Sequence, residues 1–131
     1  MTRRQPITTD RAPHAVAPYS QAMVGAGLVY TAGQIGIDPA TGRLVEGGAA
    51  AEAAQVIANL AAVLAAAGSG LDAVIKTTVF LADMDDYAAV NEAYRAGFPA
   101  PYPARTAVAV RALPLGARVE IECVALAPEP S

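Results

Sequence analysis

The chain has 131 residues, which is enough for one domain over residues 1–131 and leaves no room for a second. Hydrophobic residues make up 54% and charged residues 16%, which excludes a disordered chain, and the lone Cys and lone His exclude an internal disulfide and an ordinary zinc site. Nine basic against 12 acidic residues, with a pI near 5.0, argue against a nucleic-acid-binding surface.

The N-terminal segment, residues 1–11, is predicted to be a partly flexible tail. It contains the arginine pair Arg3-Arg4, but Pro13 and Pro18 stand where a secretion signal needs its apolar stretch. A solvated tail is therefore favoured over a signal peptide. We expect a cytoplasmic protein without membrane contact.

Residues 28–37 are predicted to form a strand, or a pair of strands, interrupted at Gly33 and Gly36. Residues 38–42 read Asp-Pro-Ala-Thr-Gly, in which the proline presets φ and the glycine accepts a positive φ. This pentapeptide predicts a tight turn after the strands.

Residues 49–67 are predicted to form the first helix, and Gly68 suits the left-handed backbone that ends a helix. The stretch is long and apolar, but it consists mostly of alanine, and polar residues recur along one side. We therefore expect a helix packed on a sheet rather than a membrane span. Its apolar stripe has helical spacing: Val56, Leu60, Val63 and Leu64.

A further strand and helix follow. Residues 73–81 are rich in β-branched side chains and predict a strand. The acids of residues 83–86 suit the N-terminus of a helix that begins near Tyr87 and carries apolar residues at helical spacing as far as Phe98. Pro99 cannot continue this helix.

Two strands, residues 105–113 and 118–127, complete the chain and are predicted to form a hairpin around Pro114-Leu115-Gly116. The order of elements predicts an α+β fold in which a mixed β-sheet carries two helices on one face. The other face is then apolar and uncovered. Because apolar residues far outnumber charged ones, we expect copies of the chain to cover that face.

Neither the lone histidine nor the lone cysteine has the setting of a catalytic residue. His14 lies in a proline-flanked stretch and is expected at the surface. Cys123 shares one side of the last strand with Val119 and Ile121 and is expected to be a buried hydrophobic residue. The sequence contains neither a GxxxxGK[ST] phosphate loop nor a GxGxxG motif after a strand.

Charged residues break the local pattern at two places. Arg105 opens a strand after a proline-rich turn, and its planar guanidinium suits bidentate binding of a carboxylate; a solvated strand end is the alternative. Glu120 and Glu122 share one face of the last strand. Such alternation usually marks a solvent-exposed face, but a carboxylate that lines a cleft could hold or activate a water molecule.

Two further residues are candidates because they place polar groups among apolar ones. Asn91 lies on the apolar stripe of the second predicted helix, where its amide either fixes a loop or reaches a ligand. Tyr19 precedes the first predicted strand, and either points its hydroxyl into a pocket or covers the core.

Six short segments, taken together and in order, resemble the reactive intermediate deaminase family (Rid, also called YjgF). The resemblance extends from about residue 12 to residue 127, nearly the whole chain. The segments are Ala17-Pro18-Tyr19-Ser20-Gln21, Leu28-Val29-Tyr30-Thr31-Ala32-Gly33-Gln34, Lys76-Thr77-Thr78-Val79-Phe80-Leu81, Val90-Asn91, Pro103-Ala104-Arg105 and Val119-Glu120-Ile121-Glu122.

The resemblance implies a chorismate-mutase-like α+β fold and a homotrimer with three clefts between neighbouring subunits. It also implies hydrolysis, without any cofactor, of 2-imino and 2-enamino acids such as 2-iminobutanoate and 2-aminoacrylate to 2-keto acids and ammonia. This activity is a form of metabolite damage control. The implied partner is a small carboxylate-bearing substrate, not nucleic acid or a membrane.

The family's site residues correspond to positions of this sequence. By the resemblance, Arg105 pairs with the substrate carboxylate and Glu120 handles the attacking water. Tyr19, Gly33 and Asn91 belong to the substrate pocket.

Two positions depart from the family pattern, which often has serine at Ala32 and cysteine at Ala107. The missing hydroxyl at Ala32 removes a hydrogen-bond partner for substrate or water, whereas main-chain contacts of Ala107 with the substrate would survive. A non-catalytic binding protein of the same fold, or a related deaminase with a different substrate, is the alternative.

Overall fold

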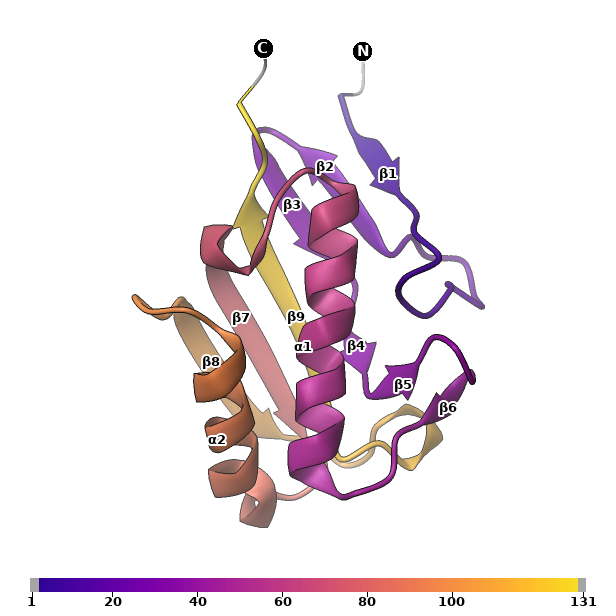
Figure 1. The fold of residues 1–131 in the computed structure, drawn as a ribbon, viewed down its shortest axis with the longest axis vertical. Coiled ribbons are helices and arrows are strands. Elements are labelled where there is room, and N and C mark those ends of the chain that lie inside the picture. The colour runs from indigo at the N-terminus through magenta and orange to yellow at the C-terminus, as the bar shows by residue number, and fades with distance from the viewer. Residues whose placement is uncertain (1–2, 130–131) are drawn as a thin grey trace.

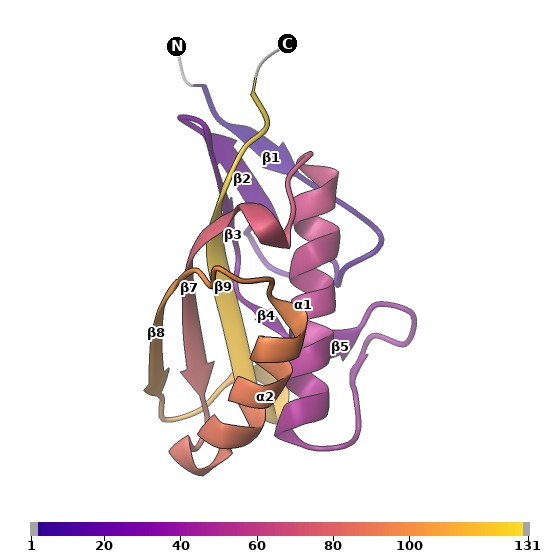
Figure 2. The ribbon, with the colours of Figure 1, turned by 60° about the vertical axis from the view of Figure 1, so that its left-hand side comes forward.

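The computed structural model describes residues 3–129 as a layer of strands with two α-helices on one face (Figure 1). Figure 2 shows both helices on the same side of the sheet, and the predicted α+β arrangement is confirmed. The elements are β1 (Gln5–Ile7), β2 (Ala22–Gly25), β3 (Leu28–Thr31), β4 (Gln34–Ile35), β5 (Ile37–Asp38), β6 (Arg43–Leu44), α1 (Ala49–Ala66), η1 (Leu71–Ala73), β7 (Val74–Leu81), η2 (Met84–Asp86), α2 (Tyr87–Gly97), β8 (Ala104–Ala109), η3 (Pro114–Gly116) and β9 (Val119–Leu126).

The main sheet is mixed, as predicted. It has 7 strands in the order β1-β2-β3-β9-β7-β8, and β4 also pairs with β9. Strands β7 and β8 run parallel because α2 connects them as a crossover, whereas the other pairs are antiparallel. Strand β8 therefore lies at an edge of the sheet, next to α2. Strands β5 and β6 form a separate 2-stranded ribbon.

Helix α1 supplies seven buried residues of the hydrophobic core between helices and sheet. It ends at Ala66, and Gly68 follows with φ 76°, the left-handed conformation that the sequence predicts. The predicted helix and its buried stripe are confirmed. The fully buried residues of this stripe are Val56, Leu60, Val63 and Leu64.

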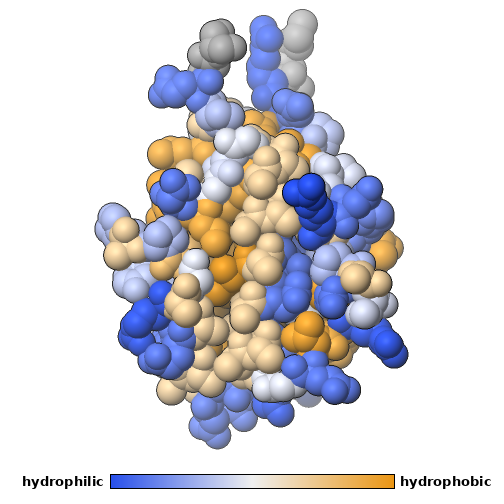
Figure 3. All heavy atoms as spheres, in the orientation of Figure 1, coloured by the Kyte–Doolittle hydropathy of each residue, from blue (hydrophilic) through white to orange (hydrophobic). Residues whose placement is uncertain are grey.

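The outward side of α1 is built from alanine. Figure 3 shows it as a pale orange column between hydrophilic edges. Among residues 3–129, α1 is the only helix long and apolar enough to cross a membrane by length and composition. Half of it is buried inside the fold, and core helices pass the same test. The exposed alanines are Ala50, Ala54, Ala58, Ala65 and Ala66.

The predicted hairpin of residues 105–113 and 118–127 is wrong. Strand β8 pairs with one edge of β7 and β9 pairs with its other edge, so β8 and β9 are not neighbours. The crossover through α2 fixes β8 parallel to β7, which leaves the opposite edge of β7 for β9. Residues 110–118 pass from β8 to β9 beyond the end of β7, and η3 is only one turn of this longer connection.

The predicted tail over residues 1–11 is wrong for residues 5–7, which form β1 and pair with β2. Ile7 is buried, and its burial together with the strand pairing fixes the segment. Arg3 and Arg4 are exposed, as expected. Residues 1–2 lie outside the described residues.

Candidate functional site

Arg105 lies in edge strand β8, and its side chain lies on the helix-covered face of the sheet. Its Nη2 donates a hydrogen bond of 3.0 Å to the Tyr87 hydroxyl, and its Cζ lies 4.8 Å from the centre of the Tyr94 ring and 5.6 Å from that of Tyr87. None of the ion pairs within residues 3–129 involves Arg105. The guanidinium therefore rests on aromatic rings and keeps donors for an anionic ligand.

Tyr94 is itself held in place. Its hydroxyl shares a hydrogen bond of 2.8 Å with the hydroxyl of the fully buried Thr77, and its ring stacks on Phe98 at a centroid distance of 4.4 Å. Burial raises the pKa of Tyr94 above its ordinary value, so the phenol stays neutral. The ring thus gives Arg105 a fixed support.

Asn91 lies one helical turn after Tyr87, in the same shallow recess as Arg105. It is half-buried, and within residues 3–129 its side-chain amide makes no hydrogen bond. Of the two roles considered for it, the structure supports an open amide beside Arg105 rather than a brace for a loop. The recess has a volume of about 260 Å³ and is lined by Asn91, Tyr94, Arg95, Tyr102, Pro103 and Arg105.

Glu120 lies on the opposite face of the sheet. Its neighbours Val119 and Ile121 are buried beneath the helices, so alternation along β9 directs Glu120 to the other side. It lines a cavity of about 770 Å³ whose walls are mostly apolar. Tyr19 and Ala32 line the same cavity.

Gly33 makes room for the Glu120 carboxylate. Strands β3 and β4 both pair with β9, but between them residues 31–33 face only residues 122–123, so the chain bulges by one residue. A Cβ atom on Gly33 would overlap Oε2 of Glu120. A side chain at position 33 would therefore displace the carboxylate.

Burial, and secondarily the charge of Glu122, raise the pKa of Glu120 above its ordinary value. Glu120 therefore keeps its proton to a higher pH than an ordinary glutamate and suits proton exchange with a bound molecule. Glu122 is exposed, whereas Glu120 is half-buried in the cavity. The alternating carboxylates thus differ in environment although they share a face.

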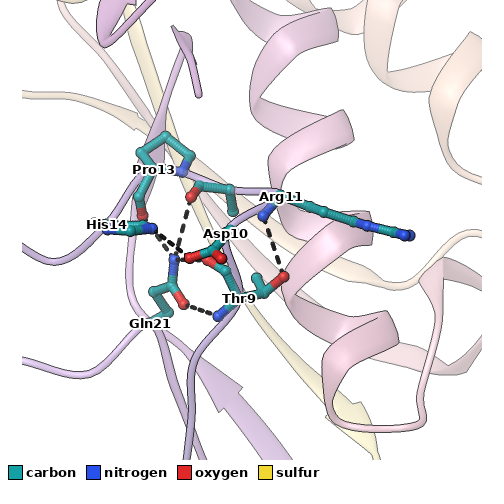
Figure 4. Close-up of polar contacts among 7 residues, drawn as sticks. Thr9, Asp10, Arg11, Pro13, His14 and Gln21 are labelled. Atoms are coloured by element: carbon teal, nitrogen blue, oxygen red, sulfur yellow. Dashed lines mark hydrogen bonds and ion pairs between the residues drawn. The ribbon is translucent and has the colours of Figure 1, made fainter. Parts of the chain in front are cut away.

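Gln21, which sequence reasoning did not single out as a functional residue, holds the segment that forms one wall of the Glu120 cavity (Figure 4). Its Oε1 accepts the Thr9 N–H at 2.7 Å, and its Nε2 donates to the carbonyl oxygens of Thr9 at 3.0 Å, Ala12 at 3.4 Å and Pro13 at 2.8 Å. Its place beside Tyr19 in the segment of residues 17–21 is the sequence signal that could have identified it.

The other sequence-based expectations are resolved as follows. His14 is exposed, as predicted, and pairs with Asp10 at 2.8 Å. Cys123 is buried, as predicted, and its N–H donates to the Thr31 hydroxyl at 3.0 Å. Burial raises the pKa of Cys123 to about 11, which disfavours the thiolate. Tyr19 is half-exposed in the cavity wall and does not cover the core.

Within one chain, Arg105 and Glu120 do not meet. They project from opposite faces of the sheet, and the recess and the cavity share no lining residue. Ala107 lies on the Arg105 side of β8 but does not line the recess. The residues that the structure describes contain no group of three or more His, Cys, Asp or Glu that could hold a metal ion.

These features define a small α+β protein with one group suited to binding carboxylates and another suited to proton transfer. A family model described as "Endoribonuclease L-PSP" matches residues 9–127, and this is the family that is also called YjgF or Rid. The chain belongs to this family, which confirms the resemblance seen in the sequence.

Characterised relatives agree with this assignment. The human 2-iminobutanoate/2-iminopropanoate deaminase is 50% identical over 123 residues, 94% of this chain and 90% of its own. The crystal structure of RidA from an Antarctic Psychrobacter superposes with a TM-score of 0.90 at 48% identity, covering 93% of this chain and 98% of the other. The structure of Escherichia coli TdcF with bound serine has a TM-score of 0.89 at 36% identity, and the match covers 95% of this chain and 99% of the other.

Proposed function

We propose that this protein hydrolyses 2-imino acids, such as 2-iminobutanoate and 2-iminopropanoate, and enamines such as 2-aminoacrylate, to 2-keto acids and ammonia without a cofactor. Relatives named for deamination of these imines are about half identical to it over most of its length. The observation that carries the proposal is the Arg105 guanidinium, which is held on two aromatic rings with donors left for a carboxylate.

The substrate site is completed by a neighbouring copy in a homotrimer of the chorismate-mutase-like kind. The sheet separates Arg105 from Glu120 within a chain, and a substrate of a few atoms cannot reach both. The sheet face without helices exposes apolar side chains suited to burial against another copy. These are Tyr30, Val108 and Leu126.

In each of the three clefts, the Arg105 recess of one subunit faces the Glu120 cavity of the next. Arg105 binds the substrate carboxylate with two charge-assisted hydrogen bonds and so fixes the imine carbon. Asn91 and the main chain at Ala107 contact the substrate from the same side. Tyr19 and Gly33 complete the opposite wall.

Glu120 performs the proton transfers. As the water oxygen attacks the imine carbon, Glu120 takes one proton from the water and delivers it to the imine nitrogen, which gives a tetrahedral carbinolamine. Glu120 then moves the hydroxyl proton of this intermediate to the amine nitrogen, and the C–N bond breaks as the C=O bond forms, so that ammonia leaves. For an enamine, protonated Glu120 first adds its proton to the terminal carbon. A raised pKa suits both roles, because both protonation states are then populated closer to neutral pH.

We also propose that one domain carries both half-sites and that the protein acts in the cytoplasm. Neither nucleic acid nor a membrane is a partner, since the formal net charge is −3 and 12 acidic residues outnumber nine basic ones.

A coupled assay tests the function. An amino-acid oxidase generates 2-iminobutanoate in situ, and release of keto acid and ammonia is compared with and without the protein. We expect release well above the spontaneous rate. Release at the spontaneous rate would refute the proposal, and carboxylate binding without acceleration would support the non-catalytic alternative. A panel of other imines separates this reaction from that of a related deaminase.

A further inference from the structure

The Tyr87 hydroxyl lies beside Arg105, and its own proton remains available for a further hydrogen bond. Arginine has only N–H donors, so in the 3.0 Å contact the Tyr87 oxygen must accept from Nη2. The phenol proton therefore points elsewhere. Within residues 3–129 no acceptor lies within hydrogen-bond distance of it, and 37% of Tyr87 is exposed.

The neighbouring contacts hold Arg105 beside the start of α2. Arg105 Cζ lies 4.8 Å from the Tyr94 ring centre, and Tyr94 is anchored by its 2.8 Å hydrogen bond to Thr77. Tyr87 is the first residue of α2, on a backbone that packs against α1. Tyr87 does not line the recess, but its hydroxyl is joined to Arg105, which does, so guanidinium and phenol are presented side by side at the recess.

We propose that Tyr87 is a second carboxylate-binding residue: its hydroxyl accepts one N–H of Arg105 and donates its own proton to the carboxylate that Arg105 binds. The ligand class, a 2-imino or 2-keto acid, rests on the proposed function. The Arg105 bond polarises the phenol and makes it a stronger donor. The pair then prefers a carboxylate over a neutral amide, because an amide has no negative charge to attract the guanidinium.

The test uses the full-length assembly and the reaction product 2-oxobutanoate, with the neutral 2-oxobutanamide as a control ligand. Tyr87→Phe keeps the ring beside Arg105 and removes only the hydroxyl. We expect the Kd for 2-oxobutanoate to rise about 10-fold, as for the loss of a hydrogen bond to a charged group. Binding of the amide should change less than about twofold, since the loss is specific to charge.

Tyr30→Phe is the matched control variant. Tyr30 lies in β3 and is half-exposed on the sheet face without helices, and it lines neither the recess nor the Glu120 cavity. Its change also removes one phenol hydroxyl, so the Kd for 2-oxobutanoate should stay within about twofold of wild type. An equal loss in both variants would overturn the assignment to Tyr87.

A double variant separates direct binding from support of Arg105. If Tyr87 contacts the carboxylate, Tyr87→Phe weakens binding further in an Arg105→Lys background, where NMR titration keeps weak binding measurable. No further loss in that background, or an unchanged Kd in Tyr87→Phe alone, would overturn the inference. A wild-type protein that binds 2-oxobutanoate in this pattern but hydrolyses no imine would refute the proposed function and leave the role of Tyr87 standing.

Discussion

The Arg105 recess and the Glu120 cavity differ in size and in charge. The recess is a shallow hollow of about 260 Å³ in which a cation rests on anchored aromatic rings. The cavity is about 770 Å³, mostly apolar, and contains a carboxyl group whose pKa is raised by burial. One region is built to hold an anion and the other to keep a proton.

This difference shows why the proposed hydrolysis needs both regions. A carboxylate substrate would be repelled by ionised Glu120 if Arg105 did not hold it, and a recess without Glu120 has no group for proton transfer. Separation across the sheet also prevents the two side chains from forming an ion pair within the chain. Within one chain, Arg105 therefore keeps its donors for a ligand, and Glu120 has no cationic partner that would lower its pKa. In the proposed cleft, the substrate carboxylate takes the guanidinium of the neighbouring copy.

The largest effect should come from Arg105→Ala. Loss of two charge-assisted hydrogen bonds should lower kcat/KM by roughly 100-fold to 10,000-fold, mainly through KM. Steady-state kinetics with 2-iminobutanoate measures this, and size-exclusion chromatography should show unchanged assembly. Arg105→Lys keeps the charge but not the planar guanidinium, so its kcat/KM should lie between those of wild type and Arg105→Ala. Full activity in Arg105→Ala would remove the recess from the mechanism.

Glu120→Gln should act on turnover rather than binding. Without a proton carrier, kcat should fall by about 100-fold or more while KM changes little. The control is Glu122→Gln, which removes the exposed carboxylate of the same strand face and should keep kcat near wild type at its optimal pH. A KM effect without a kcat effect in Glu120→Gln would make Glu120 a structural residue.

Gly33→Ala tests whether the position of the Glu120 carboxylate depends on the space that Gly33 leaves beside it. The new Cβ must push the end of the Glu120 side chain aside, and this displacement should lower kcat by roughly 10- to 100-fold. The free energy of unfolding, from urea denaturation, should stay close to wild type because the glutamate side chain can move. In the control Gly25→Ala, the nearest atom is 3.8 Å from the new Cβ, so activity should persist.

The smallest effect should be a shift in pH dependence in Glu122→Gln. The negative charge of Glu122 raises the pKa of Glu120, so removing it lowers that pKa. Glu120 then ionises at lower pH, and the acid limb of the kcat/KM profile should move to lower pH. A limb that stays in place, or moves to higher pH, would show that Glu120 is not the group titrated.

Local patterns predicted the elements that depend on neighbouring residues. The helix at residues 49–67 and the strand at residues 73–81 agree closely with α1 and β7, because stripe spacing, a terminating glycine and β-branched residues act locally. The predicted hairpin was wrong because strand order depends on the crossover through α2. The predicted tail was wrong for residues 5–7 because the burial of Ile7 depends on pairing with a later strand.

The candidate site residues could be named from the sequence, but their arrangement in space could not. The motifs make Arg105 and Glu120 candidates, and their roles stay predictions; their positions on opposite faces follow from alternation along β8 and β9 and from the edge position of β8. The role of Tyr87 was hidden for the same reason: a tyrosine at the start of a helix resembles a core residue until Arg105 is seen beside it.

A mixing experiment tests the intersubunit site most directly. Arg105→Ala and Glu120→Gln, each expected to be nearly inactive at substrate concentrations below the wild-type KM, are unfolded together in equal amounts, refolded and assayed at such a concentration. If each cleft takes its arginine and its glutamate from different copies of a trimer, about a quarter of the clefts in random mixtures regain both residues, and activity should return to about a quarter of wild type. Activity no higher than that of the separate variants would contradict a site shared between neighbouring copies.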